Sequence, residues 1–149
     1  MAGTMNESSE RVFEQLSGAA ERLLPETHVV FAYLFGSHAS GRPHRFSDVD
    51  VAVLLDESVT QHDYLDNSLK LAGLLSDGAG VGNVEVLVLN DAPLPLVGRV
   101  IQQRRILYSC DEPARVYFES LKLRQFLDFE LMMKGLDLKF LADIASCRR

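Results

Sequence analysis

The sequence predicts a single α/β or α+β domain in which helices cover a small sheet. Three apolar runs, each rich in β-branched or aromatic residues, predict strands at 28–35, 48–55 and 84–89. Around them, apolar residues recur at the spacing of amphipathic helices. A chain of 149 residues without an internal repeat or low-complexity tract is long enough for one domain with its own core.

The elements of the N-terminal half follow from capping and breaking residues. A first helix, capped by Asn6 or Ser8, is expected to run to about Leu24, and Pro25 ends it. The first strand follows as a continuous apolar run, which is typical of a buried strand. The polar loop 36–46 then opens with a helical turn and leads into the second strand.

The C-terminal half continues the alternation. Thr60 is expected to cap a helix over 60–76, and three glycines make the next turn: Gly78, Gly80 and Gly82. After the third strand come a short helix over 94–103 and a short edge strand over 106–108. Asp111 opens a long helical segment reaching Ala145. We therefore expect one domain over the whole chain, with a core at about 28–108 and a C-terminal helical segment at about 111–147.

The composition and charge narrow the classes of function. The net charge of −6 argues against a general nucleic-acid binder, because phosphate contacts need clustered Lys and Arg, but it leaves room for one nucleotide. Cys110 and Cys147 match no zinc or redox spacing. The polar segment 1–10 lacks an apolar export signal, and no apolar run approaches a membrane span. We expect a cytoplasmic protein without a membrane or direct nucleic-acid partner.

Two acids at the start of the second strand are the main candidates for chemistry. Asp48 and Asp50 are two residues apart, so their side chains point to the same face of a strand. Two adjacent carboxylates repel each other unless a cation lies between them, and Mg²⁺ prefers such oxygen ligands. The alternative is a pair of solvated acids at a strand edge. The apolar residues that follow, 51–55, favour the metal site, because carboxylates near an interior strand are costly when unpaired.

Other residues near this pair extend the candidate site. Gly36 and Ser37 follow the first strand and offer a backbone N–H cradle for phosphate, although a Gly-Ser pair alone is more often a plain turn. Glu85 is a lone charge in the third strand. By itself it is as consistent with a wet strand edge as with a site. Beside two other acids, a third carboxylate on a neighbouring strand favours the site.

The loop between the glycine turn and the acids carries four basic or imidazole side chains: His38, Arg42, His44 and Arg45. Arg42 or Arg45 is suited to steady triphosphate oxygens, and the alternative is a solvated loop. Zinc binding by the two histidines lacks a third ligand nearby. Ser47 is expected to fix the loop beside Asp48, either as a cap or through a bond to phosphate.

The C-terminal segment has two apolar stripes at a period of 3.6 residues rather than one. A helix on a small domain needs one such stripe, so the second favours a partner interface. The alternative is that a bend at Gly135 folds the last turns back onto the domain. The first stripe comprises Phe126, Phe129, Met133, Leu136, Phe140 and Ile144; the second comprises Leu123, Leu127, Leu131, Leu138 and Leu141.

The order Gly36-Ser37, ten residues, Asp48-Val49-Asp50 resembles the nucleotidyltransferase superfamily that includes DNA polymerase beta. The chain is most similar to its minimal nucleotidyltransferases, the MNT-domain antitoxins, over about 29–108. The resemblance implies a mixed sheet flanked by helices. It also implies ATP as the substrate and two Mg²⁺ ions as the cofactor. It further implies a partner, a helical HEPN-domain ribonuclease toxin encoded alongside, and AMP transfer to a tyrosine of this toxin with loss of pyrophosphate.

The same resemblance implies roles for individual residues. Gly36 and Ser37 would hold the β- and γ-phosphates, Asp48 and Asp50 would hold the metals, and Glu85 would take the third acidic position, where many relatives have Asp. Two other functions stay open. One is a binding module that neutralises its partner by covering it; the other is transfer to a small-molecule hydroxyl, for which little chain is left to build a pocket. Assembly into a homo-oligomer also stays open.

Overall fold

The computed structural model describes residues 2–41 and 48–147. Four helices and four strands are found in this part of the chain, linked in places by short 3-10 turns. In chain order they are α1 (Ala2–Leu23), β1 (Val29–Phe35), β2 (Val49–Leu55), α2 (Tyr64–Ala79), β3 (Val84–Val88), α3 (Leu94–Gln103), β4 (Arg105–Ser109) and α4 (Glu112–Cys147).

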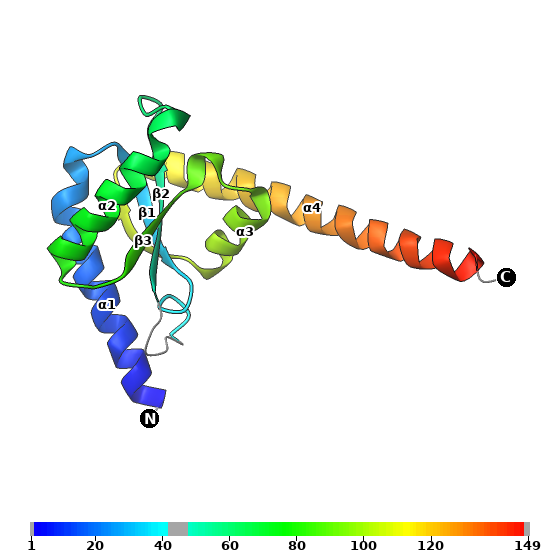
Figure 1. The fold of residues 1–149 in the computed structure, drawn as a ribbon, viewed down its shortest axis with the longest axis horizontal. Coiled ribbons are helices and arrows are strands. Elements are labelled where there is room, and N and C mark those ends of the chain that lie inside the picture. Colours follow the sequence, from blue (N-terminus) through cyan, green and yellow to red (C-terminus); the bar gives the residue numbers. More distant parts are fainter. Residues whose placement is uncertain (1, 42–47, 148–149) are drawn as a thin grey trace.

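The four strands form one mixed sheet in the order β3-β2-β1-β4. Strand β1 is antiparallel to β2 and β4, whereas β2 and β3 are parallel. The expected fold class is confirmed, and β4 lies at an edge, as its short apolar run indicated. Helices α1 and α2 cover one face, and α3 with the first part of α4 covers the other (Figure 1).

The alternation of side chains along the central strands divides the core between the two faces. Leu34 and Val51 pack with residues of α1 and α2. Tyr33 and Ala52, one residue away in each strand, pack with residues of α3 instead. Since Asp50 lies two residues before Ala52, its side chain belongs to the α3 face.

Helices α1 and α2 differ from their expected bounds. Helix α1 begins at Ala2, before either expected cap. A 3-10 turn precedes α2, and Thr60 makes no capping hydrogen bond. Helix α2 passes through Gly78 and ends at Ala79, followed by Gly80 as its C-cap with a left-handed φ of 68°. The expected end at Ser76 was therefore too early, because one glycine within a helix costs only about 1 kcal/mol.

Helix α4 is unbroken over 36 residues, and it extends far beyond the rest of the molecule (Figure 1). The bend expected as an alternative at Gly135 is wrong. Phe126 is buried at home, but every residue from 131 to 146 is exposed. Both apolar stripes therefore face solvent in the second half of α4. Within the described residues, no helix is both long enough and apolar enough to cross a membrane.

Candidate functional site

The three candidate acids meet at the end of the sheet where β2 and β3 begin. Asp50 and Glu85 are direct partners across the parallel pair β2–β3, so their side chains leave the same face. Asp48 precedes β2 immediately, and the Val49 N–H donates to the Asn83 carbonyl at 2.9 Å, which aligns the two strand starts. Asp48 and Glu85 are exposed, while Asp50 is half-buried.

The electrostatics of Asp50 reflect its neighbours. Burial, followed by the negative charges of Glu85 and Asp48, raises the pKa of the Asp50 carboxyl, whereas His38 acts in the opposite direction. Among the described residues, the one charge that lowers this pKa is that of His38, and the pKa stays raised overall. In the described part of the chain, no group of three or more His, Cys, Asp or Glu side chains is assembled that could hold a metal ion as it stands.

The glycine turn lies directly against Asp50. Gly36 follows β1 with a left-handed φ of 76°, and Phe35 before it pairs with Asp50 across β1 and β2. A Cβ atom on Gly36 would overlap the Asp50 carboxylate. Only glycine therefore suits both the backbone conformation and the space. The Gly36 N–H donates to the Gln103 Oε1 at 3.3 Å, so the end of α3 also reaches the turn.

The residues after Gly36 form the single helical turn expected for this loop. The Ser40 N–H donates to the Gly36 carbonyl at 3.2 Å, and the Ser40 hydroxyl donates to the Ser37 carbonyl at 3.0 Å. His38 is buried, at 8% exposure, and its Nδ1 has no hydrogen-bond partner among the described residues. Ser37 is half-buried beside it.

Two of the expected nucleotide-binding residues, Arg45 and Ser47, lie outside the described residues, as do Arg42 and His44. Two side chains next to the site were missed by sequence reasoning. Gln103 is at the end of a short helix, and nothing in its neighbourhood in the sequence marks it. His38 was considered as a zinc ligand or as part of a solvated loop, and the second reading is wrong for it, because the fold buries His38 near Asp50.

A second polar cluster ties α4 to the sheet on the same face. Glu119 of α4 accepts hydrogen bonds from Tyr33 at 2.6 Å, from Arg104 at 2.7 Å and from Arg115 at 2.7 Å. Burial alone would raise the pKa of Glu119, but the hydrogen bonds from Tyr33 and Arg104 and the two guanidinium charges lower it overall. Burial and then Glu119 raise the pKa of Tyr33. Glu119 therefore stays ionised and acts as an anchor.

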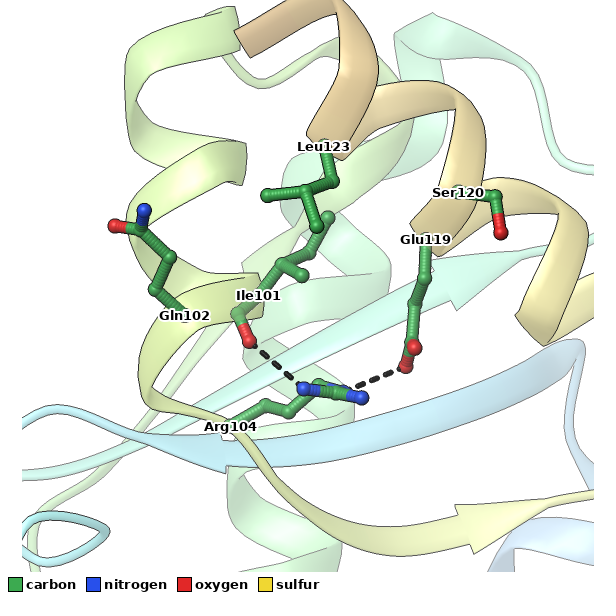
Figure 2. A pocket seen from close by; sticks show the side chains of 6 residues that line it. All are labelled: Ile101, Gln102, Arg104, Glu119, Ser120 and Leu123. Carbon is green, nitrogen blue, oxygen red and sulfur yellow. Dashed lines mark hydrogen bonds and ion pairs between the residues drawn. The ribbon is translucent and has the colours of Figure 1, made fainter. Parts of the chain in front are cut away.

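An open pocket of about 250 Å³ lies beside this anchor, between α3 and α4. Figure 2 shows Arg104 reaching from the end of α3 to Glu119, with the carbonyl of Ile101 accepting a second bond at 3.0 Å. The lining of the pocket also includes Gln102, Ser120 and Leu123. The pocket combines apolar walls with a neutralised ion pair, so its lining shows no preference for a charged ligand.

Comparisons with known proteins agree with this geometry. The family described as polymerase beta, nucleotidyltransferase, matches residues 19–113. The chain is 28% identical over 99 residues to protein adenylyltransferase MntA of Shewanella oneidensis. The aligned region spans 66% of this chain and 68% of MntA.

Solved structures of toxin–antitoxin systems share the fold. One is a toxin–antitoxin structure with AMP-PNP, with a TM-score of 0.58, 22% identity and coverage of 86% of this chain and 97% of that one. Another is a complex of tri-AMPylated Shewanella oneidensis HEPN toxin with MNT antitoxin, with a TM-score of 0.50, 16% identity and coverage of 97% and 98%.

Proposed function

Because the chain belongs to the polymerase beta nucleotidyltransferase family, and is thereby a nucleotidyltransferase, we propose that it is an antitoxin that transfers AMP from ATP to a protein partner. The partner is a HEPN ribonuclease toxin, and the acceptor is a tyrosine hydroxyl. Two likenesses support this choice: the relative MntA is a protein adenylyltransferase, and structures of similar fold are toxin–antitoxin complexes, one with an AMPylated HEPN toxin.

The observation that carries the proposal is the pairing of Asp50 with Glu85 across β2 and β3, beside the glycine turn. The donor set fits a hard cation, because it consists of carboxylate oxygens around a carboxyl whose pKa is raised by burial and by its like-charged neighbours. Asp48 and Glu85 are exposed and free to rotate toward such an ion. When bound, Mg²⁺ would neutralise the triphosphate and lower the pKa of the acceptor hydroxyl.

The protein's own groups then have distinct tasks. Asp48 and Asp50 hold the cation, and Glu85 takes the proton of the attacking hydroxyl or joins them as a ligand. The hydroxyl oxygen forms a bond to the α-phosphorus, the bond from this phosphorus to the bridging oxygen of the β-phosphate breaks, and pyrophosphate leaves. Gly36 and Ser37 bind the β- and γ-phosphates. The Gly36 N–H becomes available only when Gln103 releases it.

The test is transfer of label from ATP labelled at the α-phosphate to the purified HEPN-domain toxin that the proposal names as partner. We expect Asp48→Asn and Asp50→Asn each to reduce the rate by about 100-fold or more, since each removes charge complementarity at the reacting phosphate. Asp77→Asn, on the exposed side of α2, is the matched control and should label at the wild-type rate. Undiminished labelling by Asp48→Asn would refute the catalytic role.

A second candidate function is neutralisation by covering the partner, without chemistry. The exposed half of α4 favours it, because this surface provides binding independently of the acidic site. The variant with all three acids neutralised, Asp48→Asn, Asp50→Asn and Glu85→Gln, separates the two functions. If this variant still protects cells from the partner fully, binding is the function; if protection is lost while the complex forms, transfer is.

A further inference from the structure

The second half of α4, residues 131–146, is exposed to solvent along its whole length. Residues 131–146 extend from the body over about 24 Å at 1.5 Å per residue (Figure 1). Eight large apolar side chains in this stretch are exposed. A monomeric protein rarely leaves so continuous an apolar surface in water. The eight exposed side chains are Leu131, Met132, Met133, Leu136, Leu138, Phe140, Leu141 and Ile144.

All of these side chains except Met132 occupy two separate sides of the helix. At 100° per residue, the centre of the first stripe lies roughly 140° from the centre of the second when their residues within 131–146 are counted. Asp137 lies between the stripes on one side. Lys139 and Asp143 lie between them on the other side, where Met132 is the only large apolar residue.

The position of the stripes on two sides of the helix decides which kind of occupant fits. A helix about 10 Å wide and 24 Å long has a lateral surface of about 750 Å². A second copy of α4 lying alongside would cover roughly a third of this surface and would leave one of the two apolar stripes in water. An occupant that packs on both stripes covers most of this surface. Two apolar walls facing a helix are what a groove between two helices of a bundle provides.

The root of the helix extends the same surface. Leu123 begins the second stripe and also lines the pocket between α3 and α4 (Figure 2). The Glu119 anchor and the packing of Phe126 over Gly98 hold α4 to the body at this point. A partner on the second stripe therefore reaches the pocket without a gap, on the sheet face that also carries Asp50 and Glu85.

We propose that residues 131–146 of α4 insert between two helices of the partner, with one apolar stripe against each, and that the α3–α4 pocket receives a side chain of the same partner. This inference rests on the proposed function, since it takes the helical toxin as the occupant. It assigns affinity to α4 and leaves the chemistry to the acidic site.

Three substitutions of one kind test the two-sided contact in the full-length chain: Leu136→Gln on the first stripe, Leu138→Gln on the second, and Met132→Gln as the control on the polar side. Calorimetric titration with the purified HEPN-domain toxin should show that each Leu variant weakens Kd by about tenfold or more. Met132→Gln should change it less than about twofold. Thermal unfolding should be the same in all three, because these side chains are exposed.

The alternative outcomes are distinct. If only one Leu variant weakens binding, or none does, the groove is overturned. Sedimentation showing a dimer of this chain that either Leu variant dissociates would assign the surface to a second copy and overturn it too. AMP transfer to the partner with an unchanged KM in the Leu variants would sink the docking proposal and leave the proposed function standing. If both Leu variants weaken binding as expected but the wild-type chain transfers no AMP to the partner, the docking proposal stands and the proposed function fails.

Discussion

Replacing Gly36 by alanine tests the closeness of the glycine turn to the acidic site. The substitution has two separate costs. The left-handed φ of 76° is unfavourable for alanine, and the new Cβ would overlap the Asp50 carboxylate. Turning the carboxylate aside relieves only part of this overlap, because its Cγ would also lie 3.3 Å from the new Cβ.

The magnitudes follow from these two costs. A left-handed conformation costs alanine about 1–2 kcal/mol, and forcing apart packed groups costs about 1–3 kcal/mol. Gly36→Ala should therefore destabilise the fold by about 2–5 kcal/mol, a drop in Tm of roughly 5–15 °C for a domain of this size. Gly80→Ala is the matched control, since its φ is 68° but no atom lies within 4 Å of the new Cβ. It should cost only the strain, about 1–2 kcal/mol.

Thermal unfolding followed by circular dichroism measures both variants, and label transfer from ATP measures their activity. We expect Gly36→Ala to lose transfer as well as stability, and Gly80→Ala to keep transfer. In an Asp50→Ala background, Gly36→Ala should cost no more than Gly80→Ala does, because the clash is gone. Equal losses for the two glycine variants in the wild-type background would refute the reasoning, as would a loss at Gly36 that Asp50→Ala leaves unchanged.

Three further predictions concern charge and packing. Asp50→Asn should raise Tm at pH 7, because burial and like charges hold the folded pKa of Asp50 above its unfolded value and its ionised form destabilises the fold; the gain should vanish below about pH 3.8, the unfolded value. Glu119→Gln should cost about 2–3 kcal/mol at pH 7, since it leaves Arg104 without its carboxylate partner. That loss should fade as pH falls through the lowered folded pKa of Glu119, which pH-dependent unfolding checks. Gly98→Ala places a Cβ in the ring of Phe126 and should lower stability by about 1–3 kcal/mol, measured by urea unfolding.

The strands were predictable because each is a short apolar run bounded by turn residues. Their order in the sheet was not, since pairing joins segments far apart in sequence; the resemblance supplied the mixed sheet. The first helix was predicted too short, because residues 2–5 show no apolar face and the expected capping residues, Asn6 and Ser8, come after them. The sequence did not decide whether α4 is straight or bends at Gly135. A glycine weakens a helix slightly but does not break it, and the helix is straight.

The candidate site was partly accessible in the same way. Charges within apolar strands single out Asp50 and Glu85, but only the parallel register of β2 and β3 makes them direct neighbours. The contact of Gln103 with Gly36 spans 67 residues, and that of Tyr33 with Glu119 spans 86. No local pattern carries such contacts. They arise when α3 and α4 pack on one face of the sheet.

The account depends on Asp48, Asp50 and Glu85 acting as one acidic site that takes up ATP together with Mg²⁺. Calorimetric titration of the chain with ATP, with and without Mg²⁺, measures this directly. We expect ATP to bind in the presence of Mg²⁺, to bind far more weakly without it, and to lose its Mg²⁺ dependence when the three acids are neutralised together. Absence of ATP binding in Mg²⁺, or an unchanged Kd in the neutralised variant, would contradict the account.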